Sequence, residues 1–171
     1  MGMFDSIDVI LDKDGVSPFR CAAGHNVFEF QTKDLNDLMD SYKIIGSRLY
    51  GPTAKEGAWQ SVFEMVGADL IERMNRVYPP SKFTGQLTVY TSCPECDPVV
   101  YENPGASWNG GVAERSVWCE YLATFKDGLL IEVAPEKLET RDEIRKATVG
   151  ALSDDDRVAK KHIAQFKARG H

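Results

Sequence analysis

The chain has 171 residues and a formal net charge of −6 at pH 7, and it is 43% hydrophobic and 27% charged. This composition is ordinary for a globular domain with a core, and it excludes disordered and collagen-like proteins. No apolar run approaches the roughly 20 residues of a membrane-spanning helix, and the acidic N-terminus lacks the basic region of a signal peptide. We therefore expect a cytoplasmic protein with no membrane partner.

The N-terminal half of the sequence predicts short strands and then one long helix. Alternating apolar residues predict strands over 4–11, 26–32 and 42–50, the last interrupted by Gly46. Residues 33–42 are expected to form a short helix.

The clearest helix is expected at about 54–78. Thr53 and Glu56 have the spacing of a capping box, in which two side chains satisfy free amide groups at a helix start. One apolar stripe follows at helical spacing, and Pro79 and Pro80 end it. The stripe comprises Trp59, Val62, Phe63, Val66, Leu70, Met74 and Val77.

The C-terminal half predicts strands over 86–92, 116–125 and 129–134, the last two joined by a tight turn at Lys126-Asp127-Gly128. Residues 97–113 are rich in Pro, Gly and Asn and are expected to form a long loop. From Thr140 the chain becomes helical, and Ser153 is the expected N-cap of a last helix.

These elements predict an α+β fold, with a mostly antiparallel sheet, a zinc-ribbon-like knuckle, the long helix at about 54–78 and a C-terminal helical arm. The expected domains are a zinc-stabilised α+β domain over 1–139 and the arm over 140–171.

Cys93-Pro94-Glu95-Cys96 has the spacing of a zinc knuckle, because two intervening residues let both thiolates reach one tetrahedral ion. A strand leads into the motif, and the loop that follows it disfavours a thioredoxin-like redox pair, which needs a helix there.

Cys21 and His25 are the expected remaining ligands, with Gly24 permitting a sharp turn before the histidine. Cys119 is the competitor for the fourth position. It alternates with Val117 and Tyr121 on the inward face of a strand, which favours a buried core thiol. Four protein ligands make a closed site, so the zinc is expected to be structural.

No catalytic motif is present: the sequence lacks HExxH, a Walker loop and GxSxG. We therefore predict that the protein is not an enzyme. The least favoured hypothesis is an uncharacterised enzyme with its site in the 97–113 loop around Trp108.

Three segments resemble small proteins encoded by bacteriophages and prophages: the Met1–Asp5 start, the Phe30–Leu35 string FQTKDL, and the Cys93/Cys96 knuckle. Such proteins tend to carry CxxC in their first half, where this chain has Cys21 and His25. The resemblance implies a phage or prophage origin and an accessory or virion-associated role with no assigned activity.

The C-terminal arm carries five Lys and Arg residues from Arg157 onwards and no acid, after three Asp residues. Acidic residues at the start of a helix and basic residues at its end complement the helix dipole. The candidate partner-binding residues are Lys160, Lys161, Lys167 and Arg169. A narrow apolar stripe containing Val158, Ile163 and Phe166 would suit a protein partner or a second copy of the chain.

We therefore predict a non-enzymatic, phage-type accessory or virion-associated protein that has a structural zinc and acts through protein–protein contacts. It would act in the host cytoplasm or in the virion. The alternative is a nucleic-acid-binding regulator with a zinc-ribbon scaffold and a basic C-terminal helix. Nucleic acid is the less favoured partner because the acidic chain repels phosphates.

Overall fold

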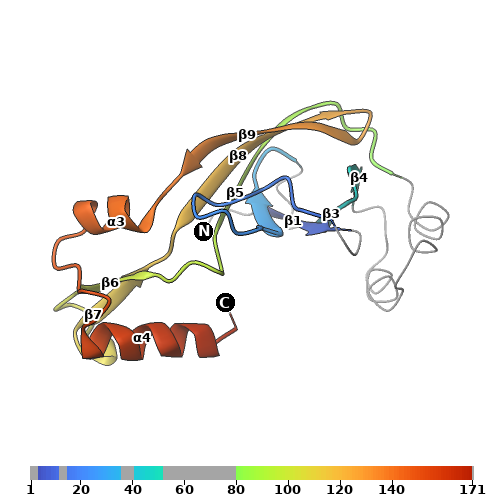
Figure 1. Ribbon diagram of the computed structural model, residues 1–171. Coiled ribbons are helices and arrows are strands. Elements are labelled where there is room, and N and C mark those ends of the chain that lie inside the picture. The colour runs from blue at the N-terminus through green and yellow to red at the C-terminus, as the bar shows by residue number, and fades with distance from the viewer. Residues whose placement is uncertain (1–3, 12–14, 36–40, 52–79, 171) are drawn as a thin grey trace. The chain divides into compact units, whose positions relative to one another are not determined.

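The computed structural model of the protein describes residues 4–11, 15–35, 41–51 and 80–170 (Figure 1). Its chain divides into two compact units, each with its own buried residues. Unit 1 consists of residues 1–19, 26–91 and 120–136, and unit 2 consists of residues 20–25, 92–119 and 137–171. Residues 140–171 thus share unit 2 with two earlier segments of the chain.

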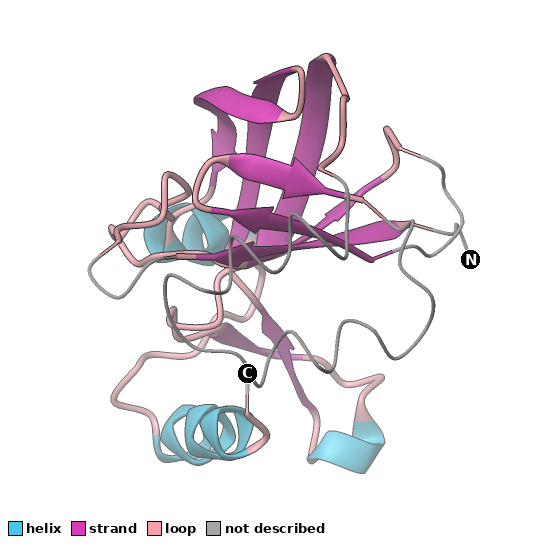
Figure 2. Cartoon of the chain, turned by 90° about the vertical axis from the view of Figure 1, so that its right-hand side faces the viewer, coloured by secondary structure: helices cyan, strands magenta, loops and turns pink. Residues whose placement is uncertain are grey.

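Seven strands form a closed barrel, and most of their residues belong to unit 1 (Figure 2). The order around the barrel is β1 (Asp5–Ile10), β2 (Glu29–Thr32), β5 (Gly85–Ser92), β8 (Trp118–Lys126), β9 (Leu129–Leu138), β4 (Arg48–Tyr50) and β3 (Ser41–Ile45). Strand β1 pairs antiparallel with β2 and parallel with β3, and the parallel pair closes the barrel.

Every second side chain of a strand fills the interior of unit 1, because successive residues of a strand point to opposite faces. In β1 every second residue is buried, including Ile7 and Val9. Phe19, Phe30 and Tyr121 form an aromatic cluster in which the ring centroids lie 4.6 to 5.8 Å apart. Large buried rings of this kind contribute much of the apolar area that stabilises a core.

Unit 2 is built on a two-stranded hairpin of β6 (Val99–Glu102) and β7 (Val112–Arg115), with the short 3-10 helix η1 (Ser107–Asn109) between them. Two helices, α3 (Arg141–Ala147) and α4 (Arg157–Ala168), both contact β6. The small core under α4 consists of Val100, Val112 and Ala159, with Leu152 and Ile163 packed against it.

Side-chain caps fix where both helices begin. Thr140 and Glu143 form a complete capping box at the start of α3. At α4 the carboxylate of Asp156 accepts hydrogen bonds from the backbone N–H groups of Val158 and Ala159. The prediction that Ser153 is this N-cap was therefore wrong, because Ser153 lies one turn earlier and its carbonyl accepts from the Asp156 N–H.

The predicted α+β fold class was also wrong. The described residues form mainly strands, with a closed barrel and two short helices in place of a mostly antiparallel sheet covered by a long helix. The helix predicted at about 54–78 lies outside the described residues, as do residues 36–40 of the helix expected at 33–42. No described helix is long and apolar enough to cross a membrane.

Two further segments differ from the prediction. Ser41 and Tyr42, at the end of the expected short helix, belong to β3, whereas the strand predicted over 42–50 is present as β3 and β4 on either side of Gly46. The expected loop at 97–113 contains β6, η1 and the start of β7. Val99 and Val100 are buried there, but this apolar run is too short to stand out among the surrounding Pro, Gly and Asn residues.

Candidate metal centre

The first pair of candidate ligands lies in a tight turn of unit 2. The Gly24 N–H donates to the Cys21 carbonyl at 2.8 Å, and the Cys21 N–H donates to the His25 carbonyl at 3.1 Å. Gly24 has a φ of +85°, a conformation that is strained for residues with a Cβ. These bonds place the Cys21 and His25 side chains together at one end of the turn.

The second pair begins where β5 ends. The Cys93 N–H donates to the Val117 carbonyl at 2.9 Å, which fixes the start of the Cys93–Cys96 turn within unit 2. Both thiols are buried, with exposed fractions of 1% for Cys93 and 6% for Cys96. The predicted strand-to-knuckle connection is thus present.

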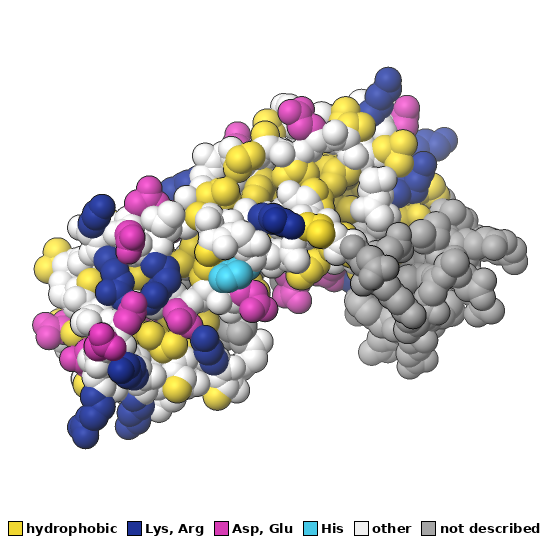
Figure 3. All heavy atoms as spheres, in the orientation of Figure 1, with side chains coloured by type: hydrophobic (Ala, Val, Ile, Leu, Met, Phe, Trp, Pro, Cys, Tyr) yellow, Lys and Arg dark blue, Asp and Glu magenta, His cyan; other side chains and the backbone are white. Residues whose placement is uncertain are grey.

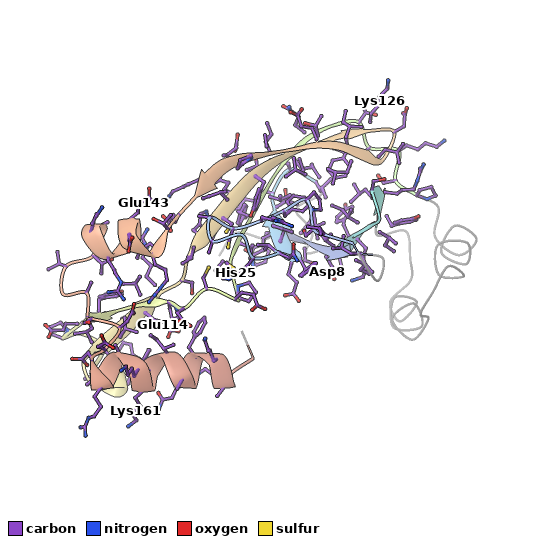
Figure 4. All side chains as sticks on the ribbon, viewed as in Figure 1. Asp8, His25, Glu114, Lys126, Glu143 and Lys161 are labelled. Carbon is purple, nitrogen blue, oxygen red and sulfur yellow. The ribbon has the colours of Figure 1, made fainter. Side chains whose placement is uncertain are left out.

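The four side chains converge on one point, and Figure 4 labels His25 among them. The His25 Nδ1 atom lies 3.4 Å from the Cys96 sulfur and 3.9 Å from the Cys93 sulfur. The Cys21 and Cys96 sulfurs are 3.7 Å apart, and all four ligand atoms lie within 4.8 Å of one another. Three thiols and an imidazole so placed can hold a metal ion.

Burial sets the protonation chemistry of these thiols. Desolvation raises the pKa of Cys93, against a smaller lowering by hydrogen bonds from the Cys96 thiol and the backbone N–H groups of Glu95 and Cys96. Desolvation also raises the pKa of Cys96 strongly, and the neighbouring Cys93 and Cys21 sulfurs raise it further. A metal that binds here must displace protons, because thiolates are the ligand form.

Arg141, the first residue of α3, borders the same site. Its guanidinium donates to both carboxylate oxygens of Asp154, at 2.7 and 3.1 Å, and to the Pro98 carbonyl at 3.3 Å. The pKa of Arg141 is raised first by the hydrogen bond to Asp154 and further by the nearby Asp97 and Cys96. A cavity of about 360 Å³ lined by His25, Cys96 and Arg141 opens beside the ligands.

Cys119 is outside this cluster. It is fully buried in β8, as its alternation with Tyr121 on one strand face predicted, and His25 supplies the fourth ligand atom. Sequence reasoning missed Arg141. The capping-box pattern of Thr140 and Glu143 marks the start of α3, but nothing in the sequence relates that position to Cys96.

The four candidate partner-binding residues do not form one group. Lys160 pairs with Asp155 at 3.3 Å, and Lys167 pairs with Asp97 at 2.8 Å. Arg169 is the C-cap of α4. Lys161 lines a separate cavity between η1 and α4.

Comparisons with protein-family models, with curated proteins and with solved structures give no match. The chemistry of the centre is therefore inferred from its own residues.

Proposed function

We propose that Cys21, His25, Cys93 and Cys96 bind one structural zinc ion, and that the protein is a non-enzymatic accessory protein that acts through protein–protein contacts. The observation that carries this proposal is the convergence of four ligand atoms from two sequence-distant turns. Each turn brings two ligands, an arrangement typical of structural zinc sites.

The distances suit a tetrahedral metal ion such as zinc. A tetrahedral zinc ion has Zn–S bonds of about 2.3 Å and Zn–N bonds of about 2.1 Å, so its ligand atoms are roughly 3.5–3.8 Å apart. The separations of 3.4, 3.7 and 3.9 Å bracket that range. Thiolate and imidazole ligands in a tetrahedral arrangement favour zinc over the hard cations Mg²⁺ and Ca²⁺, which prefer oxygen.

The ligand set also favours a structural role over a catalytic one. Four protein ligands complete a tetrahedron and leave no position for an activated water. Three thiolates, a neutral imidazole and Zn²⁺ together carry one negative charge, and the Arg141 guanidinium beside Cys96 partly compensates it. Zinc binding would then add directly to the folding free energy of unit 2.

The test is elemental analysis of the purified protein, together with the variants Cys96→Ser and Cys119→Ala. We expect about one zinc per chain in the wild type and in Cys119→Ala, and none in Cys96→Ser. Loss of a structural metal is expected to cost at least about 4 kcal/mol of unfolding free energy, which lowers Tm by about 10 °C or more in a chain of this size.

Cys119→Ala is the matched control, because it removes a buried thiol that is not a ligand. Co²⁺ substitution gives a second readout, since thiolate-bound tetrahedral Co²⁺ absorbs visible light. A wild-type protein that contains no metal after growth with added zinc, and a Cys96→Ser variant as stable as wild type, would overturn the proposal.

The phage-type role is supported by the resemblance of the Met1–Asp5 and Phe30–Leu35 segments to phage and prophage proteins. An antibody against the chain, applied to separated particle and cytoplasmic fractions of phage-producing cells, tests this role. Detection in particles identifies a virion component and detection in the cytoplasm alone identifies a host-directed accessory protein. The role is rejected if the source genome has no phage genes near this one.

A further inference from the structure

Unit 2 contains another cavity, which lies apart from the proposed zinc site. It has a volume of about 620 Å³ and lies between the η1–β7 segment and α4, within the size range of small-molecule sites. Its lining includes Trp108 and Val112 from the hairpin and Arg157, Lys161, His162 and Gln165 from α4.

Trp108 is the most unusual residue of this lining, because its exposed fraction is 80%. A folded chain normally buries a large apolar ring, because burial removes the apolar surface from water. The loop that presents it is held by backbone hydrogen bonds, from Gly111 N–H to the Ala106 carbonyl and from Asn103 N–H to the Gly111 carbonyl. The ordered loop therefore presents the indole as an aromatic surface open to a ligand.

The charge of the cavity is opposite to that of the whole chain. Arg157 and Lys161 lie four residues apart on α4, a spacing that places both side chains on one helix face. Within the described part of the chain no ion pair is found for either, whereas Lys160 and Lys167 on the same helix pair with Asp155 and Asp97. The lining contains no Asp or Glu, so these two cations favour an anionic ligand.

A contact between α4 and β7 holds the α4 side of the cavity in place. His162 is 8% exposed, and its Nε2 atom lies 3.0 Å from the Glu114 carboxylate on β7. Figure 4 labels Glu114 on the hairpin and Lys161 on α4, and Figure 3 shows Lys and Arg side chains projecting over α4. The contact ties the helix to the hairpin that carries Trp108.

We infer that this cavity binds a nucleobase with its phosphate, presented by single-stranded nucleic acid. The base would stack on the Trp108 indole, and the phosphate would contact Arg157 and Lys161. Stacking on an exposed aromatic ring beside cationic side chains is how proteins hold single strands without reading their sequence. A duplex keeps its bases stacked inside, so it cannot use the indole in this way.

The acidic remainder of the chain limits the affinity. Two phosphate contacts predict a slope of about −1.4 for the logarithm of the binding constant against the logarithm of the salt concentration. Binding is therefore expected at low salt and is expected to weaken only gradually as salt is added.

The experiment measures fluorescence anisotropy of a labelled 12-residue oligothymidylate with the zinc-loaded protein. The variants are Trp108→Ala, Trp108→Phe, the double variant Arg157→Ala with Lys161→Ala, and the control Lys160→Ala, whose side chain is already paired with Asp155. Stacking is typically worth about 1–3 kcal/mol per base, so Trp108→Ala should weaken binding by about tenfold or more.

Trp108→Phe should retain most of the affinity, the double variant should flatten the salt dependence, and Lys160→Ala should bind as wild type does. Because Trp108 is exposed, its replacement should leave Tm and the zinc content unchanged. A failure of this inference is therefore distinguishable from a failure of the zinc proposal.

Competition experiments with unlabelled molecules distinguish a free nucleotide from single-stranded nucleic acid as the ligand. Unlabelled thymidine monophosphate that competes as well as the strand identifies a free nucleotide, and competition by the strand alone identifies single-stranded nucleic acid; both support a base-and-phosphate site. Absence of binding at low salt overturns the inference. It is also overturned if binding is insensitive to Trp108→Ala, or if a duplex or a polyglutamate peptide competes as well as the single strand.

Discussion

Ion pairs between individual side chains of unit 2 position the α3 segment beside the candidate metal ligands. Asp154 accepts hydrogen bonds from Arg141, and Arg145 pairs with the same carboxylate. The pKa of Asp154 is lowered chiefly by the hydrogen bond from Arg141. Paired carboxylates of this kind stabilise the fold only while they are ionised.

Asp154→Asn is therefore expected to destabilise the protein in a pH-dependent way. The folded pKa lies below the unfolded value, so the contribution of Asp154 is complete above the unfolded value and is lost as the pH falls through the folded one. For this partly exposed network we expect a loss of about 0.5–1 kcal/mol at pH 7. Urea unfolding at several pH values should show that the difference from wild type narrows towards acid.

Asp155→Asn is the matched control, because Asp155 is 95% exposed and pairs only with the exposed Lys160 among the described residues. It should change the unfolding free energy little at any pH. An Asp154→Asn defect that persists undiminished at acid pH would contradict the ion-pair explanation.

Among the secondary-structure elements, the turn between β8 and β9 is the most constrained by its sequence. Asp127 and Gly128 both have positive φ, at 50° and 77°, which matches the predicted Asp-Gly hairpin signal. A Cβ on Gly128 would lie 1.9 Å from the Ser81 carbonyl oxygen, so the position also has no space for a side chain.

Gly128→Ala is expected to cost more than about 3 kcal/mol of unfolding free energy, because the overlap with backbone must be relieved by moving the chain. The movement would strain the hydrogen bond from the Gly128 N–H to the Phe83 carbonyl. Gly46→Ala is the control, since Gly46 has a φ of +60° but open space around it. Backbone strain alone should cost about 1–2 kcal/mol there, and thermal unfolding compares the two. Equal losses would show that the contact with Ser81 is unimportant.

The N-cap of α4 gives a second prediction about a single secondary-structure element. Asp156→Ala removes the side chain that accepts hydrogen bonds from Val158 and Ala159, and N-cap losses of this kind typically cost about 1 kcal/mol. Ser153→Ala should cost clearly less, because Ser153 precedes the helix by a turn. Chemical denaturation measures both variants, and a larger loss for Ser153→Ala would restore the original N-cap prediction.

For the whole molecule, the main consequence of two units is that the proposed metal site lies entirely within one of them. The barrel residues of unit 1 have their own core, formed by side chains such as Ile7, Leu87 and Phe125. The core of unit 2 is smaller, and small cores commonly need a metal or another cross-link.

Removal of zinc with a strong chelator is expected to unfold unit 2 before unit 1. Hydrogen exchange should then speed up at amides such as those of Cys93, Glu102 and Lys160, while the Val9 and Leu49 amides of unit 1 stay protected. Re-addition of zinc should restore protection. Equal loss of protection in both units would mean that the two unfold as one cooperative body, and no change would mean that zinc has no structural role.

Local patterns in the sequence predicted a good part of the elements. Alternating apolar residues located β1, β5 and β8 within a few residues, because a strand with one buried face must repeat every second residue. The same alternation gives no information about which strands pair. The parallel contact of β1 with β3, which closes the barrel, depends on residues more than 30 positions apart and was not predicted.

The sequence by itself determined the candidate ligand types, the Cys93–Cys96 turn and the Asp-Gly hairpin, because spacing and backbone preference act between near neighbours. Only the tertiary structure decided that His25 and not Cys119 joins Cys21, Cys93 and Cys96, that the sheet closes, and that Trp108 lines the same cavity as Arg157 and Lys161. Those outcomes depend on how distant segments bury their apolar faces together, which is a property of the whole packed chain and of no single segment.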